Sequence, residues 1–409
     1  MTSLVADKDI LGNGSFDGLL AVVVLALIVV GFVGMSSASI EFSAEKYGDP
    51  FFHMYRYLFH LSIGLIGGLI VYRIPMSFWQ RTGWMWLCVG FLLLVLVLIP
   101  GVGREVNGSQ RWLGFGPITI QSSELMKGCM IIYLAGYLVR RQDEVREEWR
   151  GFVKPMVVLF VATLLLMLEP DFGATVVTVG TAFGMIFLAG VRLWQFLLVI
   201  MASVAALLIL IVSEPYRMKR LTAFTDPWAD QFDTGYQLTQ ALIAFGRGEW
   251  FGVGLGNSIQ KLFYLPEAHT DFVFAIFAEE FGVVGALTVM SLFCCLVVRV
   301  MSIGRSAELN NQLFNAYIAY GVALMIGGQV FINIGVNIGL LPTKGLTLPF
   351  ISYGGTSLIV CCGLMALIFR VSCELNAVKR ESLKLPAKKI KRDVRAKAAE
   401  MFGKEVQPT

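Results

Sequence analysis

The chain has few charged residues for its length. Asp, Glu, Lys and Arg together make up 15% of its 409 residues, whereas a typical soluble domain contains about 25%. Hydrophobic residues reach 56%, and the mean hydropathy is +0.70. This balance argues against a soluble enzyme and predicts a protein that crosses a membrane several times.

Residues that commonly bind metals are also scarce. The chain has three histidines, and its seven cysteines all lie in or beside apolar segments. Their spacing matches neither a zinc site nor a disulfide framework, so we interpret the cysteines as buried apolar side chains. The acidic run of Asp226, Asp230 and Asp233 does not fit a calcium loop and indicates a solvated turn. We therefore identify no cofactor, although Mg²⁺ or Mn²⁺ could assist at a phosphate group.

Apolar runs long enough to cross a bilayer recur along the sequence, because a helix needs roughly 20 residues to span it. We predict an all-α fold with about ten transmembrane helices and a long extracytoplasmic loop between helices 7 and 8. The first run is too long, and the flank before it too acidic, for a cleaved signal peptide. The predicted spans are 17–39, 57–73, 84–100, 121–140, 154–169, 174–190, 193–213, 271–300, 312–338 and 353–372.

Basic residues predict the orientation, because Lys and Arg accumulate in short cytoplasmic loops. If the N-terminus is cytoplasmic and the spans alternate, the cytoplasmic pieces carry about twice as many Lys and Arg residues as the outer ones. Both termini are then cytoplasmic. The predicted parts are a cytoplasmic segment 1–16, a transmembrane domain 17–372 that includes the large outer loop 214–270, and a basic cytoplasmic tail 373–409.

The basic part of the tail, from Lys379 to Lys404, has two interpretations. It can be a disordered segment beside the membrane that is attracted to anionic membrane lipid. Alternatively, it can be a docking site for a cytoplasmic partner. Nothing else in the chain supports binding to nucleic acid.

The outer loop 214–270 is longer than a simple connection needs, and loops of that length are usually functional or disordered. Its many aromatic residues argue against disorder. Apolar periodicity through Tyr236–Phe245 predicts a short amphipathic helix at the membrane interface. The glycines between Gly246 and Gly256 predict tight turns, because the βαβ context of a phosphate-binding loop is missing.

The end of this loop is the strongest functional signal in the sequence. Glu267, His269 and Asp271 stand immediately before a long apolar run, where water meets the membrane. Ionisable groups at that depth are costly unless they have a function. We therefore place a functional site there.

Two other segments near the outer face support the same site. Residues 341–355 contain prolines and glycines that break a helix near membrane depth, with Lys344 and Ser352 among them. Irregular backbone at that depth is tolerated where it lines a cavity. Arg111 and Trp112 follow a polar run in an earlier outer loop, although Trp is also ordinary at a membrane interface.

Two charged motifs have structural as well as functional interpretations. Glu124 and Lys127 are three residues apart on one helix face, so they can neutralise each other or contact a substrate. Asp171, in the turn after Glu169 and Pro170, can cap the next helix or line a cavity. An outer cavity with cations and a carboxylate suits an anionic, lipid-linked substrate.

On these segments the chain resembles the SEDS family (shape, elongation, division and sporulation). Residues 217–228 and 237–256 favour the branch that acts in division over the branch that acts in elongation. Two positions depart from the family pattern: Glu169 replaces an expected Gln, and Ser123 replaces a frequent Ala. The resembling stretches are Gln110–Trp112, Gln121–Lys127, Glu169–Thr175, Glu214–Arg217, Gly235–Gly256, Leu265–Gly282 and Leu341–Ser357.

The resemblance implies a peptidoglycan glycosyltransferase that polymerises lipid II into septal glycan strands at the outer face of the bacterial inner membrane. Asp271 matches the family's essential aspartate, and we predict that it acts as the general base for the acceptor sugar 4-hydroxyl. An α-linked donor and a β-linked product favour single displacement over an aspartyl–sugar intermediate. The predicted substrate-binding residues are Arg111, Trp112, Glu124, Lys127, Arg217, Arg220, Glu267, His269, Lys344 and Ser352. Four of them, Arg111, Arg217, Arg220 and Lys344, are candidates for a pyrophosphate clamp.

The resemblance also implies partners: a class B penicillin-binding protein with transpeptidase activity, and other proteins of the division complex (the divisome). Two other functions stay open. A lipid II flippase needs a polar path through the midplane, whereas only Glu124 and Lys127 are predicted to lie deep. A non-catalytic scaffold would keep its activity when Asp271 is replaced.

Overall fold

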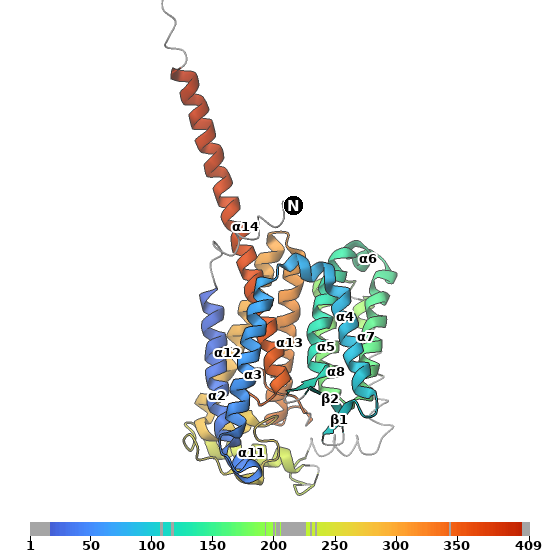
Figure 1. Cartoon of the computed structure of the whole chain (residues 1–409), viewed down its shortest axis with the longest axis vertical. Coiled ribbons are helices and arrows are strands. Elements are labelled where there is room, and N and C mark those ends of the chain that lie inside the picture. The colour runs from blue at the N-terminus through green and yellow to red at the C-terminus, as the bar shows by residue number, and fades with distance from the viewer. Residues whose placement is uncertain are drawn as a thin grey trace, which may run out of the picture.

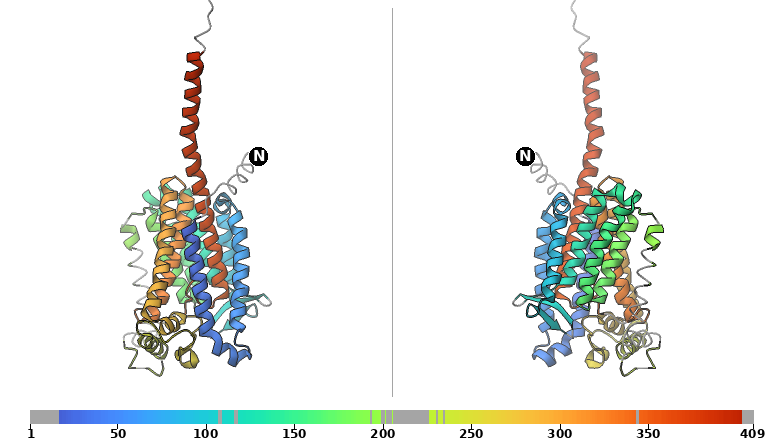
Figure 2. Two further views of the ribbon diagram at one scale, coloured as in Figure 1. Left: turned by 90° about the vertical axis from the view of Figure 1, so that its left-hand side faces the viewer. Right: turned by 90° about the vertical axis from the view of Figure 1, so that its right-hand side faces the viewer.

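The chain forms a bundle of long, roughly parallel helices (Figure 1). The computed structural model describes residues 17–106, 109–115, 118–192, 194–198, 201, 205, 226–229, 231–233, 235–342 and 345–402. A small β-sheet and helix α11 (Tyr236–Gly248) lie at one end of the bundle, and helix α14 (Gly355–Phe402) projects from the other (Figures 1 and 2). The two ends of the bundle therefore differ in structure, as expected for a protein with one end on each side of a membrane.

The membrane-spanning elements match the apolar runs of the sequence. The other helices of the bundle and its ends are α2 Gly18–Tyr47, α3 Phe52–Arg73, α4 Met76–Leu98, α5 Ser122–Arg140, α6 Gln142–Glu147, α7 Trp149–Leu168, α8 Phe172–Leu188, α12 Val273–Leu309 and α13 Leu313–Asn337. In the described part of the chain, 7 helices are long and apolar enough to cross a membrane; α8 is apolar but shorter. The prediction of a mostly helical polytopic membrane protein is confirmed. The span predicted at 193–213 falls largely outside the described residues.

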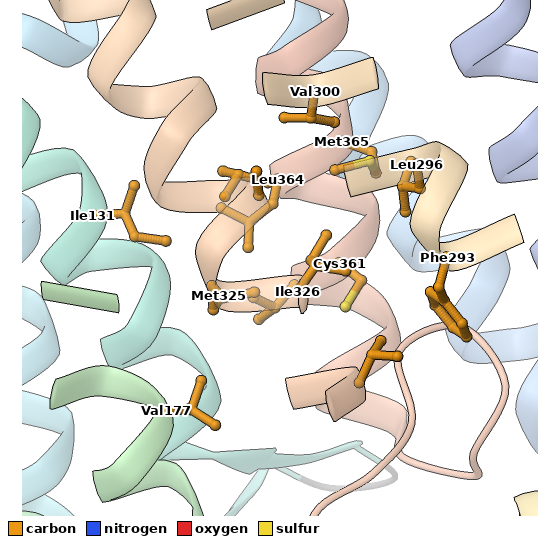
Figure 3. Packing of buried hydrophobic residues seen from close by; sticks show 14 of the residues in the cluster. Ile131, Val177, Phe293, Leu296, Val300, Met325, Ile326, Cys361, Leu364 and Met365 are labelled. Atoms are coloured by element: carbon orange, nitrogen blue, oxygen red, sulfur yellow. The ribbon is translucent and has the colours of Figure 1, made fainter. Parts of the chain in front are cut away.

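Helices α13 and α14 form the centre of the bundle. In each of them 72% of the most apolar stretch is buried inside the protein, against about a third or less in the other spans. Figure 3 shows Ile326 of α13 beside Cys361 of α14 in the apolar interior, with Met365 of α14 beside Leu296 and Val300 of α12. Polar side chains on these two helices must therefore find partners within the protein.

The cysteine prediction is only partly right. Cys129, Cys361, Cys362 and Cys373 are buried, and all seven cysteines are free. Cys88 and Cys294 are exposed on α4 and α12 instead. A thiol on the outside of a membrane-spanning helix contacts lipid, so low polarity there does not require burial in protein.

A three-stranded antiparallel sheet was not predicted. Strands β1 (Gly103–Val106), β2 (Ser109–Phe115) and β3 (Ile118–Gln121) are hydrogen-bonded in sequence order. Trp112 is opposite Gln121, and β3 leads directly into α5. The strands are too short to give a clear alternating pattern, which explains why we interpreted this region as a loop. The sheet positions Arg111 at the outer end of α5.

The glycine-rich part of the large loop is anchored on α12. Gly252, Gly254 and Gly256 have φ angles of +80°, +97° and +85°, which confirms the predicted tight turns at these three positions. At Gly246 and Gly248 the prediction is wrong, because both residues belong to α11. The amide groups of Val253 and Gly254 donate to the carbonyl oxygens of Glu279 and Glu280, at 3.0 Å each. A break in α12 at Gly282, where φ is +68°, makes room for this contact.

Other predictions for the outer loop and the tail have mixed outcomes. The amphipathic helix predicted at Tyr236–Phe245 is confirmed as α11. The turn at Asp226 is also confirmed, since Asp226 Oδ1 accepts a hydrogen bond from the Ala229 amide at 3.3 Å. Of the two interpretations of the basic tail, the disordered segment is wrong, because α14 continues to Phe402; the docking site for a partner stays a prediction. Lys, Arg, Ala and Glu dominate that stretch, and all favour helix.

Candidate active site at the outer end of α13

Asp271 lies in a compact turn that runs directly into α12. The amide groups of Thr270 and Phe272 both donate to the carbonyl oxygen of Glu267, at 3.1 and 3.2 Å. The carbonyl oxygen of His269 accepts from the amide of Tyr353 at 2.9 Å, which ties the turn to the irregular segment before α14. The turn and the segment form one unit, which agrees with the prediction that both lie at the same end of the membrane part.

Three amides on one face of α13 hold this unit in place. Gln329, Asn333 and Asn337 are four residues apart, and we call them the amide stripe. The Nδ2 atoms of Asn333 and Asn337 both donate to the carbonyl oxygen of Asp271, at 3.0 Å each. Asn337 Oδ1 also accepts from the amide of Ala275 at 3.2 Å. The backbone of the catalytic candidate is therefore fixed by two side chains from another helix.

The same stripe anchors the irregular segment. Asn333 Nδ2 donates to the carbonyl oxygen of Leu346 at 2.6 Å, and Gln329 Nε2 donates to that of Thr347 at 2.8 Å. We did not predict the amide stripe from the sequence. The sequence nevertheless contains a signal for it, because amides at i, i+4 and i+8 in an apolar helix share one face and need buried partners.

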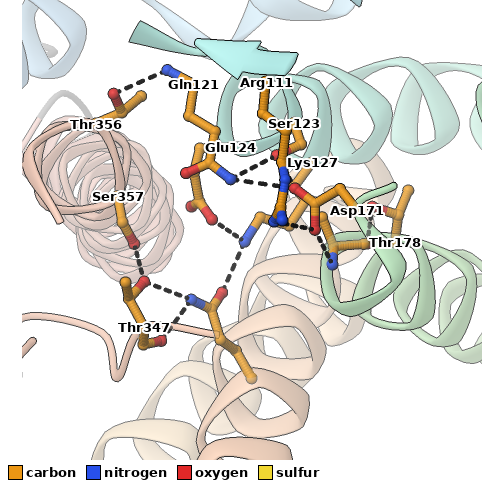
Figure 4. Close-up of polar contacts among 12 residues, drawn as sticks. Arg111, Gln121, Ser123, Glu124, Lys127, Asp171, Thr178, Thr347, Thr356 and Ser357 are labelled. Atoms are coloured by element: carbon orange, nitrogen blue, oxygen red, sulfur yellow. Dashed lines mark hydrogen bonds and ion pairs between the residues drawn. The ribbon is translucent and has the colours of Figure 1, made fainter. Parts of the chain in front are cut away.

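Glu124 and Lys127 form a buried pair that ends at this stripe. Lys127 Nζ lies 2.8 Å from Glu124 Oε1 and 2.8 Å from Gln329 Oε1 (Figure 4). Lys127 is 1% exposed and Glu124 is 4% exposed. The two charges thus neutralise each other inside the protein, which favours the interpretation that Glu124 and Lys127 form a structural pair. A contact of either residue with substrate stays a prediction.

Of the two roles that the sequence left open for Asp171, the structure confirms the helix cap, and the lining of a cavity stays a prediction. One oxygen caps α8 by accepting from the Ala174 amide at 3.1 Å. The other accepts from Ser123 Oγ at 2.7 Å and from Gln121 Nε2 at 3.1 Å (Figure 4). Arg111 Nη1 lies 3.8 Å from the capping oxygen. Asp171 therefore joins β3, α5 and α8 beneath the Arg111 guanidinium.

The environment of Asp271 favours a carboxyl group that can exchange a proton near neutral pH. Burial, followed by the nearby charge of Glu267, raises the pKa of Asp271 to about 7, and Arg111 limits this rise. Gly345 brings the backbone close, since a Cβ atom there would be 3.0 Å from Asp271 Oδ2. Asp271, Glu267 and Arg111 thus influence one another and belong to one site.

Glu169 is a second carboxyl group with an unusual environment. It is fully buried, and Ser122 Oγ donates to its Oε2 at 2.9 Å. Burial raises the pKa of Glu169 to about 8, and the hydrogen bond from Ser122 opposes that shift. The side chain is therefore mainly protonated at pH 7. A protonated carboxyl group resembles the Gln of the family pattern in shape and charge.

The remaining predicted site residues have different surroundings. Burial lowers the pKa of His269 to about 4, and its ring packs 4.7 Å from that of Phe42 and 5.0 Å from that of His53. Ser352 Oγ accepts from the Leu348 amide at 2.7 Å, and Trp112 is half-buried in β2. Their substrate contacts stay predictions.

Most of the predicted pyrophosphate clamp cannot be placed. Arg217, Arg220 and Lys344 lie outside the described residues, so their roles stay predictions. Arg111 is the member of the set that the structure places, and its side chain is 26% exposed. In the described part of the chain, no group of three His, Cys, Asp or Glu side chains could hold a metal ion. Assistance by Mg²⁺ or Mn²⁺ also stays a prediction.

Comparison with known proteins covers nearly the whole membrane part. A family model described as "FTSW_RODA_SPOVE: Cell cycle protein" matches residues 18–377. A protein of Hahella chejuensis named "Probable peptidoglycan glycosyltransferase FtsW" is 56% identical over 367 residues, which are 90% of this chain and 92% of that protein. A protein of Pseudomonas fluorescens with the same name is 57% identical over 350 residues, or 86% of both chains.

Two solved structures are also similar to this chain over most of its length. One chain comes from a structure described as "Structural coordination of polymerization and crosslinking by a peptidoglycan synthase complex". It has a TM-score of 0.73 and 28% identity, and the match covers 88% of this chain and 98% of that one. The rod shape determining protein RodA of Thermus thermophilus has a TM-score of 0.65 and 26% identity, with 88% and 97% covered.

The amide stripe predicts a local effect of Asn337→Leu. This change removes the Asn337 hydrogen bonds to Asp271 and Ala275, and each such bond contributes about 0.5–1.5 kcal/mol to stability. The Asp271 carbonyl oxygen keeps its bond from Asn333 and the Ala275 amide keeps its bond to Phe272, so the effect should be local. Hydrogen–deuterium exchange of residues 265–275 should therefore become faster. The control is Asn315→Leu in the first turn of α13, where the amide bonds only to Gln312. Equal exchange of residues 265–275 in the wild type and Asn337→Leu would contradict the anchoring role.

The buried pair predicts non-additive stability losses. Glu124→Gln and Lys127→Met each leave one charge buried without its partner, which typically costs about 3–5 kcal/mol. The double variant removes both charges, so its loss should be smaller than the sum of the two single losses. Thermal unfolding of the four proteins in one detergent measures this difference. Strictly additive losses would mean that the two side chains act independently.

Proposed function

We propose, because this chain belongs to the FtsW/RodA/SpoVE family of cell cycle proteins, that it is a peptidoglycan glycosyltransferase that polymerises lipid II. The observation that carries the proposal is the Asp271 carboxyl group. Two amides of α13 donate to the backbone carbonyl oxygen of Asp271, the pKa of its side chain is raised to about 7, and Arg111 lies near enough to lower that pKa. A base with a pKa close to the working pH is the most effective proton acceptor.

In the proposed reaction, Asp271 accepts the proton of the acceptor sugar 4-hydroxyl as its oxygen attacks the anomeric carbon of the donor. The bond from that carbon to the polyprenyl pyrophosphate breaks in the same step, so configuration inverts. Arg111 then offsets the negative charge on the leaving pyrophosphate. Arg217, Arg220 and Lys344 are proposed to complete the clamp.

The polarity of the bundle supports a membrane orientation. The Asp271 turn lies at the end that carries α11 and the sheet, opposite the end where α14 projects (Figure 1). The sequence of the projecting part is rich in Lys and Arg, which favours the cytoplasm. We therefore place both termini in the cytoplasm and the site at the outer face of the inner membrane, at the division septum.

The proposed partner is a class B penicillin-binding protein that crosslinks the new strand within the divisome. One structurally similar chain was solved in a peptidoglycan synthase complex that coordinates polymerisation with crosslinking. Exposed aromatic residues on the outer loop, including Trp250 and Phe251, offer contact area outside the catalytic turn. Aromatic side chains of this kind are enriched in protein interfaces.

The buried pair argues against the flippase alternative. A transporter needs polar groups along an open midplane path. Here Lys127 and Glu124 are buried, and Gln329 closes the pair. The scaffold alternative is addressed by replacing the proposed base.

The first test of the function is Asp271→Asn, which keeps the shape of the side chain and removes its basicity. Glycan polymer made from lipid II by the purified chain with its partner should fall by about 10²–10⁴-fold. Asp226→Asn, in the exposed turn of the same outer loop, is the control. Unchanged polymer from Asp271→Asn, with normal partner binding, would support the scaffold alternative.

The electrostatics also predict how the rate depends on pH. A general base must be deprotonated, so kcat/KM should rise as pH increases through about 7 and then level off. Because Glu267 raises the pKa of Asp271, Glu267→Gln should move this rise to lower pH. Arg111→Gln should move it to higher pH, because Arg111 lowers that pKa.

Initial rates of lipid II polymerisation between pH 5 and 9 check both shifts, with Glu105→Gln on the exposed strand β1 as the control. If both variants moved the rise in kcat/KM in the same direction, or if neither moved it, the group that titrates would not be Asp271.

A further inference from the structure

The buried face of α3 is polar in the half of the helix that lies near the outer site. His53, Tyr57 and His60 are spaced so that they share this face, and we call them the α3 stripe. Each of the three is at most 4% exposed, whereas the apolar neighbours Leu58 and Phe59 are exposed. A membrane helix that turns polar side chains inward needs partners for them within the protein. The proposed reaction assigns no role to these three side chains.

Tyr57 holds a strained turn in the irregular segment before α14. Phe350 has a φ angle of +64°, a left-handed conformation that is costly for a bulky side chain. Tyr57 Oη donates to the Phe350 carbonyl oxygen at 2.6 Å. Gly31 of α2 approaches the same oxygen so closely that a Cβ atom there would collide with it. The conformation of this turn therefore depends on contacts from α2 and α3.

His53 packs on the joint between the irregular segment and the catalytic turn. At this joint the amide of Tyr353 donates to the carbonyl oxygen of His269 at 2.9 Å. The ring centroid of His53 lies 4.8 Å from that of Tyr353 and 5.0 Å from that of His269. His53 is itself held from α2, because Ser43 Oγ lies 2.6 Å from its Nδ1 atom. His269 is two residues before Asp271, so a shift of the joint would move the proposed base.

His60 lies where the irregular segment ends and α14 begins, because α3 and α14 pack side by side (Figure 1). A Cβ atom at Gly355, the first residue of α14, would be 2.5 Å from His60 Nε2. The α3 stripe thus contacts the later part of the segment, whereas the amide stripe binds its earlier part at Leu346 and Thr347. Two helices therefore hold two different parts of the same segment.

We propose that His53 and Tyr57 are positioning residues for the general base. They fix the irregular segment and, through His269, the turn that carries Asp271. Neither residue is proposed to touch the substrate. Loss of either contact should loosen the joint and let water reach the Asp271 carboxyl group. The effect on the rate rests on the proposed function, whereas the packing can be measured without substrate.

Hydrogen–deuterium exchange of the full-length chain in detergent tests the packing. In Tyr57→Phe, residues 265–275 and 346–355 should exchange about 2–10-fold faster, because a hydrogen bond of this kind shifts a local equilibrium by about that factor. The matched control is Tyr55→Phe, which removes the same hydroxyl group from an exposed position of α3 and should change nothing. Equal exchange in Tyr57→Phe and the wild type would overturn the proposal.

The pH dependence of the rate separates positioning from a mere loss of folded protein. Burial is the main cause of the raised pKa of Asp271; Glu267 and Asp171 also raise it, and Arg111 lowers it. Water at the carboxyl group weakens the effect of burial, so the rise of kcat/KM in Tyr57→Phe should move to lower pH. A smaller folded fraction would lower the rate at every pH without moving the rise. A lower rate with the rise at the wild-type pH would therefore overturn the proposal.

His53 supplies a second and independent pair of variants. His53→Ala removes the ring between Tyr353 and His269, so it should speed exchange of residues 265–275 and move the rise to lower pH. His53→Phe keeps a ring there and should restore most of the wild-type behaviour. Equal effects of the two variants would overturn the packing role of His53. If Asp271→Asn left polymerisation unchanged, the proposed function would fail, but the exchange measurements would still decide how the turn is positioned.

Discussion

The outer site depends on the amide stripe of α13. Gln329, Asn333 and Asn337 join Lys127 of α5, the irregular segment around Leu346 and the backbone of Asp271. Within the bilayer a polar group needs a partner in the protein, so these contacts restrict where each element can lie. The backbone of Asp271, the proposed general base, is thus held by a neighbouring helix as well as by its own turn, and a rigid support of this kind favours a precise side-chain geometry.

Charge balance explains why this carboxyl group suits a general base. Burial and Glu267 raise the pKa of Asp271 to about 7, and Arg111 limits the rise. Glu124 and Lys127 neutralise each other, and burial raises the pKa of Glu169 so that it is mainly protonated. Arg111 is partly exposed and its nearest carboxylate contact, with Asp171, is 3.8 Å long, so we propose that it can also approach an anionic substrate while Asp271 accepts a proton.

The sequence predicted features that depend on local patterns. Long apolar runs located the spans, and the match of residues 18–377 confirms the resemblance to the SEDS family. The cluster of Glu267, His269 and Asp271 was predicted from its position beside an apolar helix, the family resemblance singled out Asp271, and α11 was predicted from its periodicity. The sheet and the amide stripe were missed, because both depend on contacts between residues far apart in the chain. For example, Asn337 and Asp271 are 66 residues apart, and spacing along α13 could not name that partner.

The most direct test of the central claim is a structure of the chain and its partner with two lipid II analogues bound, one of which cannot act as a donor. If Asp271 is the general base, the acceptor 4-hydroxyl oxygen should lie about 2.6–3.2 Å from a carboxylate oxygen of Asp271. The anomeric carbon of the donor should lie about 3–3.5 Å from that hydroxyl, on the face opposite the pyrophosphate. An acceptor hydroxyl beyond the reach of Asp271, with another base beside it, would contradict the account.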